Sequence, residues 1–349
     1  MIRATLGRLA SGENLSIDQM QRAVEDIMEG RLSDSEIALL LTGLRMKGET
    51  ISEIAGAAAA LRKYMTPIRT RVDGLLDTCG TGGDRSGTFN ISTAAAIVTA
   101  AAGVPVAKHG NRSVTSRSGS ADVLEALGVN IEAGVRCVET CLDELGICFC
   151  FAPLWHVSMR RVASVRQRLG VPTIFNLLGP LVNPAGATFQ LIGVGAPEQR
   201  SQLAGALALL GTEHAVVVHG EDGLDEVTLN GSTHVSEVGG RRAEGESSQK
   251  PSPADVCEFL WRPEDFGLEP KSIDSLRVDS AEESAAVIRT VLDRKRGAAR
   301  DIVVANAAAA LWTVGKAETT RDAARLAAEA IDSGAAADLL ARLVECSNR

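Results

Sequence analysis

The first 65 residues carry the apolar spacing of α-helices, with hydrophobic positions three and four residues apart in stretches such as EIALLLTGL and EIAGAAAALRKYM. Three such stretches follow a Ser or Thr that has Gln or Glu three residues later: Ser16 with Gln19, Ser33 with Glu36, and Thr50 with Glu53. This spacing is typical of the capping box at a helix N-terminus. We therefore predict a small helical domain over residues 1–70.

Beyond residue 70, short apolar runs alternate with alanine-rich helical segments. GLLDTC, VPVAKHG and HAVVVHG (214–220) are interpreted as buried strands, and DIVVANAAAALW (301–312) as a further strand followed by a loop or helix. STAAAIVTAAAG predicts a helix capped at Ser92 or Thr93 that stops at Gly103, and SADVLEALG a helix between Ser120 and Gly128. This alternation predicts an α/β domain over residues 71–349, with a largely parallel sheet covered by helices.

Two segments of this larger domain are expected to be connections. NLLGPLVNP has apolar residues between glycine and proline breakers, which predicts that the 170–190 segment returns to pack on the helical domain. Residues 240–255 are polar and contain proline, so they are expected on the surface.

Composition narrows the function classes. The chain has 349 residues, 45% hydrophobic and 23% charged, which is ordinary for a globular protein. A net charge of −8 and a pI near 5.3 argue against a general nucleic-acid binder, but one local basic cluster could still hold a small anion. No apolar run reaches the length of a membrane span, and no secretory signal is evident. We expect a cytoplasmic protein that does not bind membranes.

The seven cysteines do not form a recognisable framework. None belongs to a Cys-x-x-Cys pair, and several stand in apolar segments such as GICFCF. Buried reduced thiols are favoured, while zinc ligation and a disulfide framework stay open as alternatives. The set comprises Cys79, Cys137, Cys141, Cys148, Cys150, Cys257 and Cys346.

The stretch DTCGTGGDRSGTFNIST (77–93) places four glycines between a predicted strand and a predicted helix. It matches neither the Walker A loop nor the dinucleotide fingerprint. Glycines allow neighbouring backbone N–H groups to converge on an anion, and the helix that begins after Asn90 adds its positive dipole end. Hydroxyl and amide groups follow at Thr88, Asn90, Ser92 and Thr93. We favour a phosphate site here over a tight turn that is merely rich in glycine.

A second polar loop, KHGNRSVTSRSG (108–119), also joins a predicted strand to a predicted helix, so both loops should open at one edge of the sheet. Lys108 and Arg112 would supply charge for a diphosphate, and Ser120 at the helix start is a natural phosphate contact. His109 is equally open to a structural role and to ligand contact.

An acidic stretch, HGEDGLDE (219–226), follows a third strand and ends in Asp225 and Glu226. A solvated loop is the simpler interpretation. Because a bound diphosphate commonly requires Mg²⁺ held by one or two carboxylates, the pair is predicted as a magnesium site.

A basic helix is predicted in HVSMRRVASVRQRLG (156–170), where any single arginine could face solvent or a ligand. The chain carries no Gly-x-Ser-x-Gly elbow, no His-Glu-x-x-His and no cysteine-rich metal cluster. Phosphate cradles and metal carboxylates without a nucleophile point to catalysis by positioning and electrostatics.

Taken in order along the chain, these motifs resemble the anthranilate phosphoribosyltransferases of tryptophan biosynthesis. The resemblance covers almost the whole chain and is carried by CGTGGD…TFNIST (79–93), KHGNRSVTSRSGSADVLEALGV (108–129), FAPLWH…M..V..VR..LG (151–170), TIFNLLGPLVNPA (173–185) and HGEDGLDE (219–226). It implies a helical domain hinged to an α/β domain of the nucleoside phosphorylase-like type, assembled as a homodimer. It also implies transfer of a phosphoribosyl group from phosphoribosyl diphosphate to the amine of anthranilate, with two Mg²⁺ ions and release of diphosphate.

The resemblance also implies a role for each matching residue. The donor would be held by Gly80, Gly83, Asp84, Thr88, Asn90, Ile91, Ser92, Thr93, Lys108, His109, Gly110, Asn111, Arg112, Ser113, Ser116 and Ser120. Anthranilate would contact Gly80, His109, Asn111 and Arg166, and magnesium would be bound through Ser92, Asp225 and Glu226. An arginine complements the carboxylate of anthranilate.

Two positions depart from the family pattern, and two rival functions stay open. Arg85 stands where members usually carry glycine, and Ser164 where they usually carry proline. A pyrimidine nucleoside phosphorylase would be expected to have a Ser-Thr-Gly-Gly loop and no Asp-Glu metal pair. A nucleic-acid-binding paralogue of the fold would need a basic surface, which the net charge of −8 does not favour.

Overall fold

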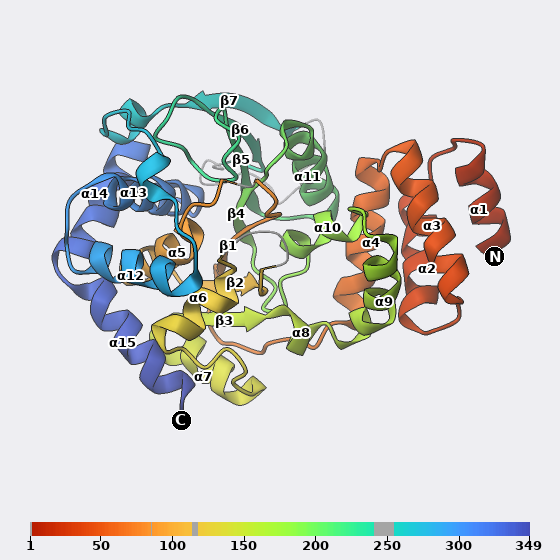
Figure 1. The fold of residues 1–349 in the computed structure, drawn as a ribbon, viewed down its shortest axis with the longest axis horizontal. Coiled ribbons are helices and arrows are strands. Elements are labelled where there is room, and N and C mark those ends of the chain that lie inside the picture. Colours follow the sequence, from red (N-terminus) through yellow and green to blue (C-terminus); the bar gives the residue numbers. More distant parts are fainter. Residues whose placement is uncertain (1, 85, 114–117, 241–254) are drawn as a thin grey trace, which may run out of the picture.

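The computed structural model describes residues 2–84, 86–113, 118–240 and 255–349. A bundle of helices lies beside a larger unit in which helices surround one sheet (Figure 1). Ser116, Arg85 and nearly all of the predicted 240–255 connection lie outside the described residues.

The helical unit contains α1 (Ile2–Ala10), α2 (Ile17–Met28), α3 (Asp34–Lys47) and α4 (Ile51–Tyr64). All three predicted capping boxes are confirmed, because Ser16, Ser33 and Thr50 each accept a hydrogen bond from the backbone three residues later and receive the reciprocal one. These local bonds satisfy backbone N–H groups of the first turn and define where each helix begins.

A later segment of the chain runs back along this bundle. It comprises α8 (Ala152–Trp155), η1 (Val157–Met159), α9 (Arg160–Leu169), α10 (Phe175–Leu178) and η2 (Gly179–Leu181). Helix α9 contacts α2 and α3, and α10 contacts α4. The helical unit is therefore completed by residues far away in the sequence.

Seven strands form one sheet in the order β3-β2-β1-β4-β5-β6-β7. Their bounds are β1 (Leu76–Gly80), β2 (Val106–Gly110), β3 (Ile147–Phe151), β4 (Phe189–Gly193), β5 (His214–Gly220), β6 (Thr233–Val238) and β7 (Cys257–Trp261). The pairs among β1 to β5 are parallel, and β6 and β7 add antiparallel strands at one edge. The prediction of a mostly parallel sheet is confirmed.

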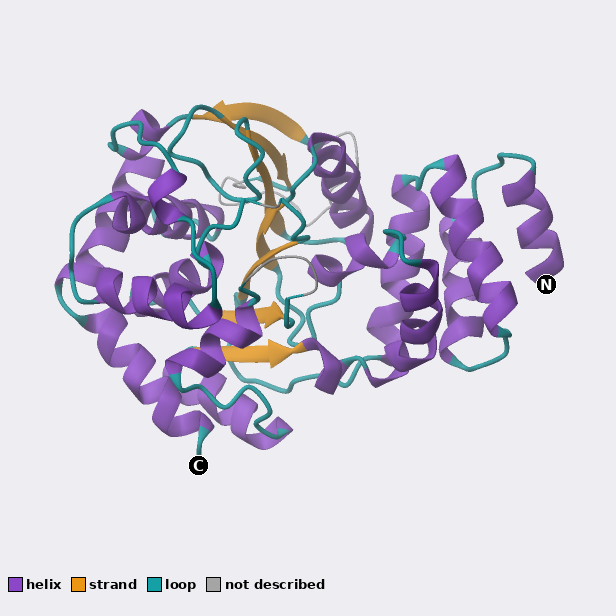
Figure 2. Cartoon of the chain, in the orientation of Figure 1, coloured by secondary structure: helices purple, strands orange, loops and turns teal. Residues whose placement is uncertain are grey.

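Helices cover both faces of this sheet (Figure 2). The helices of the larger unit are α5 (Ile91–Ala101), α6 (Ser120–Leu127), α7 (Val135–Leu145), α11 (Pro197–Leu210), α12 (Ala281–Leu292), α13 (Ala298–Thr313), α14 (Thr320–Asp332) and α15 (Ala335–Ser347). Short turns η4 (Pro263–Phe266) and η5 (Asp274–Leu276) lie between β7 and α12.

Two local predictions were wrong. The predicted strand at the start of 301–312 is instead part of α13, which is buried on almost every side. An all-round apolar segment cannot be told from a buried strand by periodicity alone. Helix α5 is capped by Asn90, whose side chain accepts from the Thr93 N–H at 3.1 Å, and not by Ser92 or Thr93.

Alternate residues of the central strands enter two different cores. Leu191 and Val216 face the core shared with α5 and α13, whereas Ile192 and Val217 face a core that continues through α11 into the helical unit. Successive side chains of a strand point to opposite faces of the sheet, so this alternation shows that both faces are buried. Helix α11 thus joins the sheet to α4, with the backbone at Gly205 lying directly against Ile51.

Candidate functional site

The carboxyl ends of β1, β2, β4 and β5 meet at one edge of the sheet. Gly80 pairs with Gly193, which in turn pairs with Val218 near the end of β5. The glycine loop, the second polar loop and the acidic stretch all begin at this edge, as expected for ligand sites of open α/β sheets.

The glycine loop is shaped by backbone conformations that favour glycine. Gly82 and Gly83 have φ angles of 65° and 87°, in the left-handed region that side chains disfavour. The far end of the loop is fixed because Phe89 N–H donates to the Leu276 carbonyl at 2.9 Å and Val278 N–H donates to that of Gly87 at 2.8 Å. The loop then enters α5 through the Asn90 cap.

Lys108 joins the glycine loop to the second strand. Its buried ammonium donates to the Thr78 carbonyl and, at 3.1 Å, to the Ser92 hydroxyl at the start of α5. Burial lowers the pKa of Lys108, while the nearby carboxylates of Asp77, Asp225 and Glu226 oppose that shift. This cation therefore faces the site interior rather than solvent.

Asp225 and Glu226 are half-buried beside this lysine. Burial raises the pKa of Asp225 well above its ordinary value, and the Asp84 and Glu226 carboxylates raise it further. Burial likewise raises the pKa of Glu226 to about 8, although the Lys108 charge and hydrogen bonds from Ser92 act in the opposite direction. Three acids held together against one cation form a site that favours an additional positive charge.

A small cavity lies between these groups. It is lined by Gly80, Ser92, Gly193, Asp225 and Glu226, together with Thr78, Cys79, Ala95, Leu191 and Asn306. A side chain at position 80 would come within 3.1 Å of the Asp225 carboxylate, so glycine keeps this approach open. Within the described residues, no group of three or more His, Cys, Asp or Glu is arranged to enclose a metal by itself.

The second polar loop is tied to the first. Asn90 donates to the Ser118 carbonyl at 3.1 Å, and Ser120 donates to the Asn111 carbonyl at 3.4 Å at the start of α6. The exposed Arg112 is turned toward α6, where it pairs with Asp122 and Glu125 at 2.9 and 2.8 Å. In this arrangement the guanidinium of Arg112 is neutralised by protein carboxylates.

The residues predicted to bind the donor differ in how far they are exposed at this site. Thr88 in the glycine loop and Ser92 in the first turn of α5 are half-buried, and Gly83 and Asn111 are exposed. The side chains of Ile91 and Thr93 are buried in the first turn of α5, and the Thr93 hydroxyl has no hydrogen-bond partner among the residues that the structure describes. Gly110 ends β2, and the Ser113 N–H donates to Asp122 at 2.9 Å.

His109 of β2 and His156 after α8 lie against each other, and only His109 was predicted as a site residue. His109 and His156 are both buried, and their Nε2 atoms lie 3.2 Å apart. The His109 Nδ1 lies 3.0 Å from the Gly179 carbonyl, and its backbone N–H donates to the buried Asp77 carboxylate at 3.0 Å. Burial lowers the pKa of His109 to about 3 and that of His156 to about 4, so both rings are neutral near pH 7. His156 and Asp77 were not predicted as site residues.

Arg166 lies on α9, in the segment that returns to the helical unit. It is half-buried, stands over the Phe175 ring at 5.7 Å from the centroid, and donates weakly to Asn176 at 3.4 Å. Burial lowers its pKa. Within the described residues, no carboxylate forms an ion pair with Arg166, whereas Arg168 pairs with Asp34.

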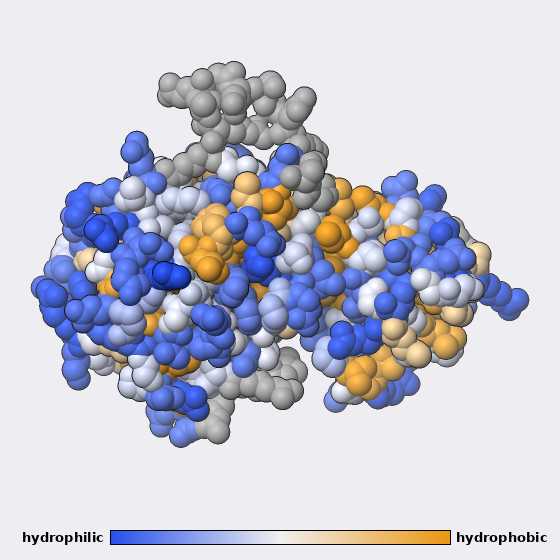
Figure 3. Space-filling view, turned by 90° about the horizontal axis from the view of Figure 1, so that it is seen from above, coloured by the Kyte–Doolittle hydropathy of each residue, from blue (hydrophilic) through white to orange (hydrophobic). Residues whose placement is uncertain are grey.

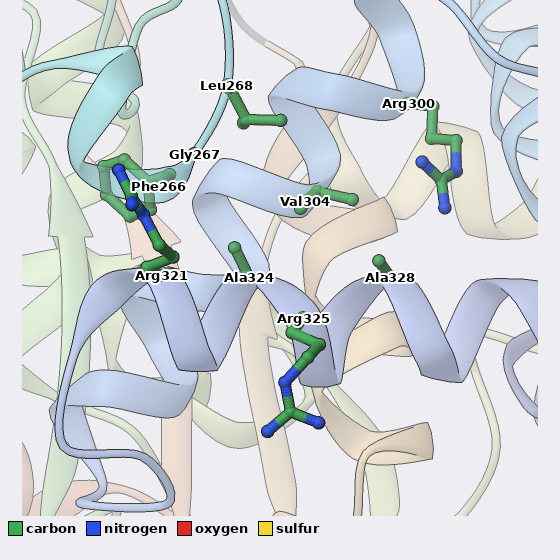
Figure 4. Close-up of a pocket in the computed structure, with 9 residues that line it drawn as sticks. All are labelled: Phe266, Gly267, Leu268, Arg300, Val304, Arg321, Ala324, Arg325 and Ala328. Carbon is green, nitrogen blue, oxygen red and sulfur yellow. The ribbon is translucent and has the colours of Figure 1, made fainter.

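A larger cavity of about 540 Å³ lies elsewhere, among η4, α13 and α14 (Figure 4). Its three arginines do not converge on a common point. Arg300 is paired with Asp332 at 2.8 Å, and Arg325, which points away from Leu268 and Val304, is paired with Glu329 at 3.0 Å. Arg321 donates to the Glu264 carbonyl. None of the described residues that line this cavity belongs to the small cavity at the sheet edge.

No helix in the described part of the chain combines the length and apolar character needed to cross a bilayer.

All seven cysteines are free thiols.

Comparisons with known proteins agree with this architecture. Residues 3–65 match the glycosyl transferase family, helical bundle domain, and residues 72–337 match the glycosyl transferase family, a/b domain. An anthranilate phosphoribosyltransferase from Rhodopirellula baltica is 49% identical over 334 residues, which cover 96% of this chain and 94% of that protein.

Solved structures show the same likeness. The crystal structure of the Thermus thermophilus anthranilate phosphoribosyltransferase has a TM-score of 0.89 and 40% identity, over 99% of both chains. The Saccharomyces cerevisiae enzyme in complex with PRPP and Mg has a TM-score of 0.87 and 26% identity, over 99% of this chain and 98% of that one. The chain thus belongs to the anthranilate phosphoribosyltransferase family, glycosyltransferase-type enzymes of tryptophan biosynthesis that transfer a pentosyl group.

Proposed function

We propose that this chain transfers the 5-phosphoribosyl group of phosphoribosyl diphosphate (PRPP) to the amine of anthranilate, and that the edge formed by β1, β2 and β5 is its donor site. The observation that carries the assignment is the position of Lys108, which bonds Ser92 of the glycine loop and lies beside Glu226 of the acidic loop. Strand β2, the start of α5 and the acidic loop, which are far apart in the sequence, thus meet around one cation. Such a set is suited to a diphosphate and its metal.

The donor phosphates would lie against the glycine loop and the start of α5. Gly82 and Gly83 are exposed and have positive φ angles, and the N-terminal dipole of an eleven-residue helix favours anions. Asn111 and Ser120 complete this cradle from the second loop. The remaining donor contacts are those implied by the family resemblance.

Magnesium would be held by Asp225, Glu226 and the Ser92 hydroxyl, with two ions in the complete site. The fit is supported by the raised pKa values of both acids, which burial and the neighbouring carboxylates cause, because a divalent cation would offset the repulsion among these acids. Mg²⁺ commonly binds one or two carboxylates and takes its other ligands from phosphates and water. When bound, it would neutralise charge on the departing diphosphate.

Anthranilate would lie between the sheet edge and the returning segment, near Gly80, His109, Asn111 and Arg166. The guanidinium of Arg166 suits a carboxylate, and its weak contact with Asn176 leaves donors to spare. His109, neutral and linked to Gly179, would shape the acceptor side without adding charge.

The chemical step needs no protein nucleophile. The acceptor nitrogen forms a bond to the ribose anomeric carbon while the bond from that carbon to the diphosphate oxygen breaks. The ammonium nitrogen then loses a proton to solvent or to diphosphate. The chain's part is to align nitrogen and carbon, and to place Lys108 near the charge that develops on the leaving group.

Assembly and compartment complete the proposal. Leu39 and Met46, seven residues apart on α3, are 60% and 84% exposed and therefore share an outward face. Hydrophobic side chains are visible on the surface of the helical unit, at the right of Figure 3. We assign this face to a second copy of the chain, as the resemblance implies.

Free thiols suit a cytoplasmic protein. We place the boundary between the helical domain and the α/β domain near residue 70.

A steady-state assay tests the proposed reaction. The full chain with PRPP, Mg²⁺ and anthranilate should consume anthranilate, which is followed by the loss of its fluorescence. Phosphorolysis of uridine or thymidine, with no anthranilate turnover, would instead establish the nucleoside phosphorylase alternative.

A further inference from the structure

Asn306 is an unusual residue for its position in α13. The helix is buried on nearly every side, and Asn306, in its centre, is fully inaccessible to solvent. A polar side chain in such a place is costly unless its hydrogen bonds are made. Alanine, which surrounds it in VVANAAAALW, would be the better helix former.

The side chain of Asn306 bonds a single residue at two points. Its Oδ1 accepts from the Val227 N–H at 2.9 Å, and its Nδ2 donates to the Val227 carbonyl at 2.9 Å. The Nδ2 also donates to the Ile302 carbonyl, one turn earlier in α13, at 2.9 Å. Only this amide orientation gives an acceptor to the N–H and donors to both carbonyls.

Val227 directly follows Glu226, so this clamp lies next to the acid pair. On the other side of the pair, the Leu224 carbonyl accepts from the Gly220 N–H at 2.8 Å. Leu224 and Val227 are both buried. The two acids therefore occupy a short span held at both ends, and Asn306 also lines the small cavity they face.

We propose that Asn306 is a positioning residue that fixes the backbone at Val227 so that Asp225 and Glu226 are aimed at the magnesium site. This inference rests on the proposed function of the acid pair. Residues that orient metal ligands change metal affinity by about 10- to 100-fold when they are removed. Asn306 would act on metal binding without touching either substrate.

The test compares Asn306→Ala with the wild-type chain in two measurements. Binding of Mn²⁺, used as a probe for Mg²⁺, is followed through the signal of free Mn²⁺ in electron paramagnetic resonance. Turnover is followed as a function of Mg²⁺ concentration. We expect the Mn²⁺ dissociation constant and the half-activating Mg²⁺ concentration each to rise about 10-fold or more, while the KM for anthranilate changes by less than about twofold.

Thr313→Val is the matched control, since Thr313 is equally buried in α13 but donates only to the Ala309 carbonyl. It should leave metal binding unchanged. If Asn306→Ala lowers thermal stability but leaves Mn²⁺ binding and the Mg²⁺ dependence intact, Asn306 only packs the core and the proposal fails. A wild-type chain without Mn²⁺ binding or Mg²⁺ dependence would instead refute the assignment of the acid pair.

Hydrogen exchange on the wild-type chain covers the case in which the alanine variant does not fold. The Val227 amide should exchange as slowly as amides in the middle of α13, because it is bonded to a buried side chain. Exchange as rapid as that of the amide of the exposed Asp222 would overturn the proposal.

Discussion

The backbone carbonyl of Asp225 lies against Gly193, in the space where any larger residue would place its Cβ atom. Gly193 ends β4, between β1 and β5, so the acidic loop crosses the sheet edge in direct contact with backbone. Glycine is required here for close approach rather than for an unusual φ angle. The position of the acid pair that we propose for magnesium thus depends on a residue of a neighbouring strand.

Gly193→Ala should displace the Asp225 backbone and lower kcat/KM by on the order of 100-fold, because misplacement of a catalytic loop by about 1 Å has effects of that size. The measurement is steady-state turnover together with thermal unfolding. Gly134→Ala is the control, since a Cβ at Gly134 meets no atom within 4 Å and φ is −65°. Wild-type turnover by Gly193→Ala would show that the loop can move without loss.

Arg166→Ala should raise the KM for anthranilate by about 10- to 100-fold, because a charge-assisted pair with the acceptor carboxylate is lost. The KM for PRPP should change far less. Arg168→Ala, on the same helix but paired with Asp34 in solvent, should behave like the wild type. Equal losses for both substrates would show that Arg166 does not select the acceptor.

The stability of the fold should depend on pH and on Mg²⁺ through the carboxyl group of Glu226. Because its folded pKa of about 8 lies above the ordinary 4.5, the folded state keeps a proton that the unfolded state loses between these pH values. The free energy of unfolding in EDTA should therefore fall as pH rises through this window, by up to about 1.4 kcal/mol per pH unit for this group. Glu226→Gln should flatten the slope in urea unfolding.

The same group predicts how Mg²⁺ affects stability. The metal binds the deprotonated carboxylate, so added Mg²⁺ should raise the unfolding temperature more at pH 8 than at pH 6. An equal shift at both pH values, or none, would argue against Glu226 as a ligand.

The His109–His156 pair should make the fold sensitive to acid. Both folded pKa values, about 3 and about 4, lie below the ordinary 6.5, so the unfolded state binds protons first as the pH falls. Their contribution to stability is complete above pH 6.5 and is lost progressively below it. His156→Gln should reduce this loss in urea unfolding between pH 6.5 and 4.5. An unchanged slope would contradict the buried neutral state.

Met46→Glu should convert the proposed dimer to a monomer, because it places a charge on the exposed apolar face of α3. Sedimentation velocity measures the change, and circular dichroism checks that the helices persist. Val171→Glu, at another exposed apolar position, is the control. A wild-type chain that sediments as a monomer would rule out the assembly.

Local chemistry made much of the fold predictable. The capping boxes at Ser16, Ser33 and Thr50 involve partners three residues apart, so their outcome was encoded within a single turn. The glycine loop and the acidic loop could be placed at one sheet edge because parallel strands present their carboxyl ends together. The resemblance to a known family then supplied the residue roles, which the geometry alone would not specify.

Other features were decided only by contacts between distant residues. Helix α13 was misread in part because an apolar segment buried on all sides lacks a diagnostic period. Asn306, a polar residue in the middle of its apolar run, was the available signal for the bond to Val227, 79 residues away, but spacing does not identify the partner.

The sequence by itself determined the helix starts, the alternation of strands and helices, and the kinds of groups available at the sheet edge. Tertiary structure decided that Lys108 faces Ser92 and Glu226, whereas Arg112 is turned toward Asp122 and Glu125. The physical reason is that helix caps depend on neighbours along the chain. The orientation of a buried charge depends on which carboxylates and hydroxyls the fold brings within a few ångströms.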